Sequence, residues 1–260
     1  ILEGNTVRGA VFESKSGRQA ILADVVVDAT GDGDIFAAAG AEFEHRTHNV
    51  GLVSRIGNLD RIDPSRAPAG NRPKRLGSRT PAPGVNWVNL TGPEVDGLDV
   101  RTLTRMEMSH RKFIWRNVQQ ARQVPGYESL YLVETAPQLG VRITRVLNGL
   151  ATVRYADLKA GRRFDDVVAV GGSTNGQHGE WQVPYGALVP KTVENVLAAG
   201  RCISAEMQMA DLVRLIPNCF ATGHAAGVAA AVAVKDHCSP RQVEVPKVQK
   251  ILREQGAYLG

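Results

Sequence analysis

A run of β-branched residues that ends in a turn of glycines and aspartates constrains this chain more than any other feature. Residues 25–40 read VVVDATGDGDIFAAAG. The run VVVDAT predicts a strand covered on both faces, and a glycine-rich turn between a strand and a helix commonly binds nucleotide phosphates. The dinucleotide fingerprint GxGxxG, however, needs a third glycine where this turn has Phe36. Asp32 and Asp34 would also repel a pyrophosphate. The sequence therefore does not predict a phosphate loop here.

The last third of the chain contains a second strong pattern. Residues 193–204, VENVLAAGRCIS, predict a strand followed by a tight turn, and residues 215–235 predict a long helix built almost entirely of small residues. Gly223 and Gly227 lie four apart in this helix. Glycine costs roughly 1 kcal/mol relative to alanine inside a helix, so the pair indicates that something approaches the helix closely. A tight contact between helix and sheet would explain the glycines as well as a ligand would.

The remaining elements follow from hydrophobic periodicity. We expect strands over residues 6–14 and 18–23, and a β-like stretch over 141–153. Residues 156–172 are expected to form a helix broken at Gly161. Residues 181–190 are expected to form an edge strand because they contain Pro184. A helix is predicted over 102–123, with its core side chains at helical spacing: Leu103, Met106, His110, Phe113, Ile114 and Val118.

A polar tract over residues 61–84 separates these elements and is rich in proline, glycine and cations. Its basic residues are Arg61, Arg66, Arg72, Lys74, Arg75 and Arg79. The tract fits either a long solvated loop or a docking arm for another polypeptide, since loops of this length are uncommon unless they are functional or disordered.

Composition excludes several classes of protein. The chain has 260 residues, 43% hydrophobic and 22% charged, which is ordinary for a globular protein with a real core. It has no apolar run long enough to span a membrane and no secretory signal, so we expect a cytoplasmic protein. Its three cysteines predict reduced thiols rather than a disulfide framework or a metal site. The net charge of +5 suits an anionic cofactor or an acidic partner, and no motif indicates nucleic-acid binding.

Several motifs in one order carry a resemblance to a known family. VVVDATGDGD, VENVLAAGRCIS and LIPNCFATGHAAGVAAA, together with PQLGVRITRVLNG, LKAGRRFDDVVAVGG and VPYGALVPK, cover essentially the whole chain. This pattern resembles the FAD-dependent oxidoreductases of the glutathione-reductase-like type, which are distantly related to fumarate-reductase flavoproteins. The resemblance implies an α/β fold in which residues 1–45 and 181–260 form part of a three-layer, Rossmann-like FAD-binding domain. Residues 46–180 would form an inserted β-rich substrate domain with one long helix.

The resemblance also implies which residues contact FAD. The GDGD turn corresponds to a second FAD-contacting turn, in which Gly31 lets the backbone pass close to the cofactor and Asp32 bonds its neighbourhood without facing the phosphates. The residues implied to bind FAD are Ala29, Thr30, Gly31, Asp32, Gly200, Arg201, Cys202, Arg214, Pro217, Asn218, Gly223, Ala226 and Gly227. We do not expect Cys202 to attach the flavin covalently.

The chain departs from the family pattern because it lacks one unit, and this absence leads us to expect a partner. Members of the family begin with a strand–GxGxxG–helix unit that holds the pyrophosphate, and residues 1–260 contain no such unit. Half of an FAD site is not expected to hold FAD tightly, and a sheet without its first strands exposes an edge. We therefore expect a second polypeptide, either a separate gene product or a cleaved piece, to supply this unit.

The expected activity is hydride transfer between flavin N5 and a small polar organic substrate. His178, in a glycine-rich loop, is the first candidate for the proton donor or acceptor, although an exposed loop histidine fits equally well. Arg142 would bind a carboxylate or another polar group, and His224 would lie near the flavin ring or pack within the helix. Two alternatives remain: a non-catalytic structural subunit of a flavoprotein complex, and an NAD- or NADP-binding enzyme without flavin. A visible spectrum separates both from a flavoenzyme.

Overall fold

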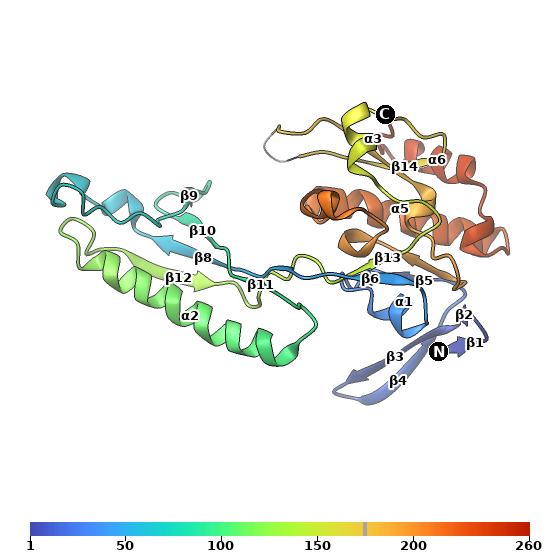
Figure 1. Cartoon of the computed structure of the whole chain (residues 1–260), viewed down its shortest axis with the longest axis horizontal. Helices are drawn as coiled ribbons and strands as arrows, with labels where there is room; N and C mark the ends of the chain where they lie inside the picture. The colour runs from blue at the N-terminus through green and yellow to red at the C-terminus, as the bar shows by residue number, and fades with distance from the viewer. Residues whose placement is uncertain (174–175) are drawn as a thin grey trace. The chain divides into compact units, whose positions relative to one another are not determined.

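The computed structural model describes residues 1–173 and 176–260, which form two compact units (Figure 1). The first unit combines Ile1–Arg46 with Ile143–Gly260, and the second is the single stretch Thr47–Arg142. The first boundary agrees with the expected one to within a residue. The second boundary was expected near residue 180 and lies at 142, because the segment after Arg142 adds strands to the core of the first unit.

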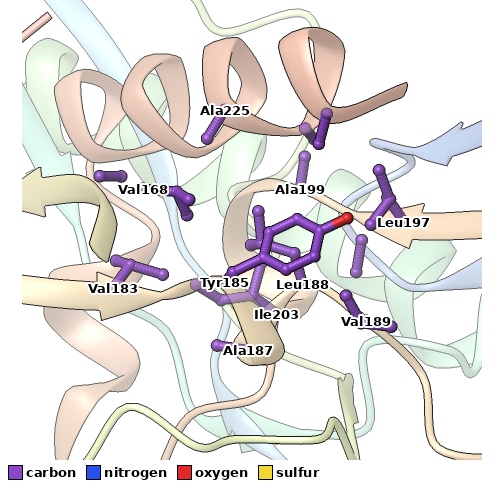
Figure 2. Close-up of a cluster of buried hydrophobic side chains, with 14 of the residues drawn as sticks. Val168, Val183, Tyr185, Ala187, Leu188, Val189, Leu197, Ala199, Ile203 and Ala225 are labelled. Carbon is purple, nitrogen blue, oxygen red and sulfur yellow. The ribbon is translucent and has the colours of Figure 1, made fainter. Parts of the chain in front are cut away.

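The first unit is built around two pairs of strands. Strands β5 (Val26–Asp28) and β16 (Val196–Ala198) pair in parallel, whereas β14 (Val167–Gly171) and β15 (Trp181–Pro184) pair antiparallel. Helix α5 (Ile216–Lys235) packs against both pairs and against helix α6 (Val245–Glu254). Figure 2 shows part of the shared core, with Ala225 of α5 facing the side chains of Val168 and Leu188.

Smaller elements complete this unit. They are β1 (Leu2–Glu3), β2 (Thr6–Val7), β3 (Gly9–Ser14), β4 (Gly17–Leu22), α1 (Asp34–Ala38), β6 (Phe43–His45), β13 (Arg145–Leu147), α3 (Tyr155–Ala160) and α4 (Ala210–Val213), with short 3₁₀ turns at Tyr185–Ala187, Gly200–Cys202, Met207–Met209 and Pro240–Gln242. The two strands expected near the N-terminus form the β3–β4 hairpin, which is exposed over most of its length.

The prediction of a broken helix over residues 156–172 is half wrong. The first part is helix α3, which ends where Gly161 adopts the left-handed conformation with φ of 59°. The second part is strand β14. Its sequence VVAVG is a short apolar run, and periodicity alone does not distinguish a buried strand from a buried helix over so few residues. The valines pair with β15 and are covered by α5, so tertiary packing decides for a strand.

The second unit is a four-stranded antiparallel sheet with one long helix on it (Figure 1). The strand order is β12 (Tyr131–Thr135), β8 (Leu52–Gly57), β10 (Asn86–Leu90) and β9 (Ser78–Arg79), and helix α2 (Val100–Arg122) packs on β8 and β12. A short pair, β7 (His48–Asn49) with β11 (Glu94–Val95), and 3₁₀ turns at Leu59–Arg61 and Pro64–Arg66 complete it.

Helix α2 confirms the predicted helix, with one error in its core face. Met106, His110, Ile114 and Val118 are buried as expected, but Phe113 is 41% exposed. Phe113 lies seven positions after Met106, a spacing that predicts the same helix face. The next residue, Ile114, takes the core position and packs with Met106 and with Leu52 of β8. Phe113 instead lies at the side of the helix, where the guanidinium of Arg75 stacks on its ring.

The described residues were also searched for membrane-spanning helices and for clusters of metal ligands. No single helix there is long and apolar enough to cross a membrane, although the bent pair Met207–Val213 and Ile216–Lys235 meets that criterion of length and composition when taken together. No three histidine, cysteine, aspartate or glutamate side chains among residues 1–173 and 176–260 come together as metal ligands would.

Candidate functional site

Two polar turns meet at one edge of the first unit. The carboxyl ends of parallel strands lie at the same edge of a sheet, so the turn after β5 and the turn after β16 are neighbours. The guanidinium of Arg201, in the second turn, donates a hydrogen bond to Asp32 Oδ1 in the first turn at 2.8 Å. The structure therefore brings together two residues that the sequence predicted separately as cofactor contacts.

Asp28 fixes the shape of the first turn. Its Oδ1 accepts hydrogen bonds from the amide and hydroxyl of Thr30, at 3.1 and 2.7 Å. Its Oδ2 accepts from the amides of Ile35 and Phe36, at 3.0 and 2.9 Å. One fully buried carboxylate thus satisfies the free amides at the start of α1 and closes the loop before it. Sequence reasoning missed this role, although an aspartate at a strand end two residues before a threonine is a signal for such a turn.

Asp32 connects the turn to β13 and to its flanking residues. Its carboxylate accepts a hydrogen bond from the hydroxyl of Thr144 at 2.7 Å, in addition to the one from Arg201. Arg145 donates to the backbone oxygen of Asp32 at 3.1 Å and to the carboxylate of Asp34 at 2.7 Å. Asp32 therefore bonds its neighbourhood, as the sequence predicted. The acidic side chains of the turn are paired with arginines of the same unit.

Gly31 lies directly against the guanidinium of Arg201, and its backbone conformation disfavours any other residue at position 31. Gly31 has φ of 83°, and a Cβ there would lie 2.3 Å from Nη1 of Arg201. The Nε of Arg201 is buried and has no hydrogen-bond partner among the described residues. A buried donor without a partner is costly. Arg201 thus holds one donor that a bound group can satisfy.

Cys202 is a structural thiol. It is fully buried, and its sulfur lies 3.5 Å from the backbone oxygen of Ala199. Burial raises the pKa of the Cys202 thiol to about 12, and the charge of Asp28 adds to this shift. The sulfur is therefore protonated at physiological pH and unreactive as a nucleophile. Its neighbour Gly200 adopts φ of 81° and donates its amide to the hydroxyl of Thr222 at 3.1 Å.

The N-terminus of α5 has no side-chain cap. Its N-cap residue is Leu215, and Pro217 occupies the first turn, where a missing N–H costs nothing. Asn218 is buried and uses its amide on the backbone: Nδ2 donates to the oxygens of Gly172 and Leu212, at 3.0 and 2.8 Å, and Oδ1 accepts from the amide of Gly172 at 3.2 Å. The side chain of Asn218 thus holds α5 to the end of β14.

A cavity of about 640 Å³ lies beside this helix end. His178 and Arg214, both predicted site residues, line it together with Tyr155. The imidazole of His178 meets the ring of Tyr155 edge to face, with centroids 6.1 Å apart. The guanidinium of Arg214 bonds the carboxylate of Asp211 at 2.6 Å. The cavity therefore combines an imidazole with an arginine and lies next to Leu215, the uncapped N-cap residue of α5, a set able to bind an anion and to exchange a proton.

The other predicted site residues lie elsewhere. Gly223 and Gly227 face open space, because no heavy atom lies within 4 Å of a Cβ at either position, whereas Ala226 faces the core. The tight packing of α5 on the strands is thus made by alanines and not by the glycines. The ring of His224 lies on the exposed side and bonds Gln255, the residue after α6, at 2.6 Å, and His224 does not line the cavity that contains His178. Arg142 belongs to the second unit.

Comparison with known proteins gives one family and one structural likeness. The model of the family described as "FAD dependent oxidoreductase" matches residues 1–252. A crystal structure of p-nitrophenol 4-monooxygenase from Pseudomonas putida DLL-E4 is similar to the chain with a TM-score of 0.43 and 14% identity. The match covers 94% of this chain and 49% of that protein, so the chain spans about half the length of the solved structure it resembles. A search of curated proteins gives no match.

Proposed function

Because the chain belongs to the FAD dependent oxidoreductase family, we propose that its first unit is part of the three-layer, Rossmann-like FAD-binding domain of an oxidoreductase. Family membership confirms both the resemblance seen in the sequence and FAD as the cofactor. The observation that carries the proposal is the junction of two turns through Arg201 and Asp32 at the carboxyl ends of β5 and β16. Ligands of open α/β sheets bind at that edge.

The residues at this junction fit a dinucleotide. Ala29 and Thr30 are exposed small residues at this turn, and Arg201 retains a buried donor that an oxygen of the cofactor would accept. Arginine is the side chain best suited to bind phosphate oxygens. When bound, FAD supplies hydride or electron transfer at its N5 atom. Cys202 takes no part in that chemistry, because its thiol is buried and protonated.

In this proposal, the residues that line the cavity beside the start of α5 bind the substrate and transfer its proton. With FAD bound, the uncapped start of α5 and the guanidinium of Arg214 would favour negative charge on the cofactor. His178 donates or accepts the substrate proton from the wall of the same cavity. Arg142, in the second unit, stays a prediction as a residue that binds a carboxylate or another polar group. His224 is the weaker candidate, since its ring already bonds Gln255.

We also propose that a second polypeptide supplies the strand–GxGxxG–helix unit that completes the FAD site. Among the described residues, β5 pairs only with β16, so its other edge is open to a further strand. The same unit leaves a set of large apolar side chains exposed: Val11, Phe12, Ile21 and Leu22 on the β3–β4 hairpin, and Ile216, Phe220 and Val234 on α5. Exposed apolar surface of this extent is typical of an interaction site.

Native mass spectrometry of the protein isolated from its own source, with a visible spectrum of the same sample, tests both proposals. We expect the absorption bands of oxidised flavin, and a complex mass that contains FAD and a second polypeptide. A colourless sample without FAD would overturn the FAD-binding proposal. A sample that contains FAD bound to one uninterrupted polypeptide would retain FAD binding and overturn the separate partner.

A pair of arginine variants tests the assignment of Arg201 in the flavin-containing protein. Arg201→Gln should weaken FAD binding by about tenfold or more, as expected for the loss of a charge-assisted hydrogen bond. Arg253→Gln removes an exposed charge on α6 and should leave FAD binding unchanged. Equal FAD affinity in both variants would remove Arg201 from the proposed site. Urea unfolding of each variant verifies that the fold persists.

A further inference from the structure

The second unit contains a large cavity that lies outside the proposed FAD site. Its volume is about 580 Å³, within the range typical of sites for small molecules. It lies between the sheet and α2, with Ile56 of β8, Val88 of β10 and Val118 of α2 among its lining residues. These side chains give the cavity an apolar body. Nothing in the proposed function uses it.

A buried hydroxyl without a partner lies in the wall of this cavity. Ser54 is 1% exposed and lies on the same face of β8 as Leu52 and Ile56, the face that packs against α2. Its Oγ has no hydrogen-bond partner among the described residues, although Ser54 lines the cavity. Buried hydroxyls are nearly always paired, and leaving one unpaired costs free energy. A ligand atom that bonds Ser54 Oγ would remove that cost.

Two cations form the rim of the cavity. Lys74 and Arg75 line it, and no described carboxylate lies within ion-pair distance of either. The segment that carries them is held to the sheet, because the amide of Asn86 donates to the backbone oxygen of Leu76 at 2.9 Å. The guanidinium of Arg75 stacks on the ring of Phe113, 5.5 Å from its centroid, and so joins the segment to α2.

Gly77 allows this close approach of the segment to the sheet. It has φ of 72°, and a Cβ there would lie 2.1 Å from the backbone oxygen of Trp87 in β10. The rim is therefore built by specific contacts at both ends rather than by a free loop. This part of the basic tract 61–84, whose role the sequence left open, folds onto its own unit.

We propose that this cavity binds a small organic acid with an apolar body, whose carboxylate meets Lys74 and Arg75 and whose far end bonds Ser54. The cationic rim selects a negative charge, since charge-assisted hydrogen bonds are the stronger kind. The apolar walls select an aromatic or aliphatic body, and the unpaired hydroxyl selects a polar atom opposite the carboxylate. The proposal depends on the second unit alone and stands whether or not the proposed FAD site is correct.

Three related compounds probe each part of the site by isothermal titration calorimetry on the full chain. The first, 4-hydroxyphenylacetate, carries the carboxylate, the apolar ring and a polar far end. The neutral alcohol 2-(4-hydroxyphenyl)ethanol lacks the charge, and phenylacetate lacks the far hydroxyl. We expect 4-hydroxyphenylacetate to bind most tightly of the three. No heat of binding for either acid at millimolar concentration would overturn the proposal.

Variants connect the binding to the named residues. Replacing both rim cations, by Lys74→Gln with Arg75→Gln, should weaken 4-hydroxyphenylacetate binding about tenfold or more and leave the neutral alcohol unaffected. Arg116→Gln removes an exposed charge from α2 outside the cavity lining and should change neither affinity. Ser54→Ala should weaken binding of the hydroxylated acid about fivefold and leave phenylacetate unchanged. Acid binding that survives the double rim variant would place it elsewhere and overturn the site.

Discussion

The two long helices of the molecule, α2 and α5, differ in the residues on their outer faces. Helix α2 buries Met106, Ile114 and Val118 on one side, and its other side mixes charged and polar residues with the exposed side chains of Met108 and Trp115. Helix α5 buries alanines on one side, and its opposite side exposes Ile216, Phe220 and two glycines. An ordinary surface helix has one apolar stripe and one polar face. The outer face of α2 is thus mixed, whereas α5 contains a single charged residue, Lys235, and has a second apolar face that fits contact with another surface.

The largest effect is expected for a substitution on the buried face of α2. Met106→Ala should lower the free energy of unfolding by about 3 kcal/mol, because it leaves a cavity among Leu52, Ile114 and Leu139. Met108→Ala, two positions on and 64% exposed, should change it by less than about 0.5 kcal/mol. Urea unfolding of both variants measures the difference. Equal losses would show that the outer face of α2 is also covered.

A smaller effect should separate the two faces of α5. Ala229→Leu introduces a large side chain at a fully buried position and should cost about 2 kcal/mol through overpacking. Ala231→Leu lies on the exposed side and should be nearly neutral in the chain on its own. The two variants have the same chemistry in the same helix, so thermal unfolding reports position alone. A large cost for Ala231→Leu would mean that the outer face is already occupied within this chain.

The glycines of α5 provide the next test. Gly227→Ala should stabilise the chain on its own by about 1 kcal/mol, because nothing lies within 4 Å of the added methyl and alanine is the better helix former. Gly161→Ala also meets no neighbour, but its φ of 59° makes alanine costly by about 1 kcal/mol. Opposite signs for the two variants are expected in urea unfolding.

A larger side chain at Gly227 tests the outer face of α5 in the flavin-containing protein. If the outer face of α5 contacts the proposed partner, Gly227→Leu should reduce the recovered complex while leaving the chain folded. Ala231→Leu lies one turn further on the same face and measures how far that contact extends. Full recovery of the complex with Gly227→Leu would contradict the proposed contact.

The contrast between α2 and α5 also shows what the sequence could predict. Both helices, the strand at Val26–Asp28 and the turn after it follow from periodicity and glycine placement. The spacing of Gly223 and Gly227 indicated close approach, but it could not show that the glycines face away from the strands, because alanines at other positions pack equally closely. Strand β14 was missed because its short apolar run is ambiguous until β15 pairs with it.

The candidate site was predictable in part for a similar reason. Asp32 and Arg201 were predicted from separate motifs, but their hydrogen bond depends on parallel pairing between strands about 170 residues apart in the chain. The cavity that joins His178 to Arg214 depends on the path of a loop, which no periodicity encodes. Asp28 looked like an ordinary strand end, and only the structure shows that its two oxygens bond four separate donors.

The smallest expected effect concerns the helix ends, where α2 and α5 differ again. The carboxylate of Asp99 caps α2 by accepting from the amide of Arg101 at 3.0 Å, whereas α5 has no side-chain cap. A hydrogen bond from Thr102 holds the pKa of Asp99 below its ordinary value of 3.8. A lowered pKa in the folded state means that the capping contribution is present at neutral pH and is lost as the pH falls through the lowered value.

Asp99→Asn isolates the charge in that cap, because asparagine caps a helix about as well but does not titrate. Asp99→Ala, which removes the cap, should be the less stable variant of the two at neutral pH. The difference in stability between the wild-type chain and Asp99→Asn should shrink as the pH falls below 3.8, measured by urea unfolding at stepped pH. A difference that stays constant with pH would mean that Asp99 acts through hydrogen-bond geometry alone.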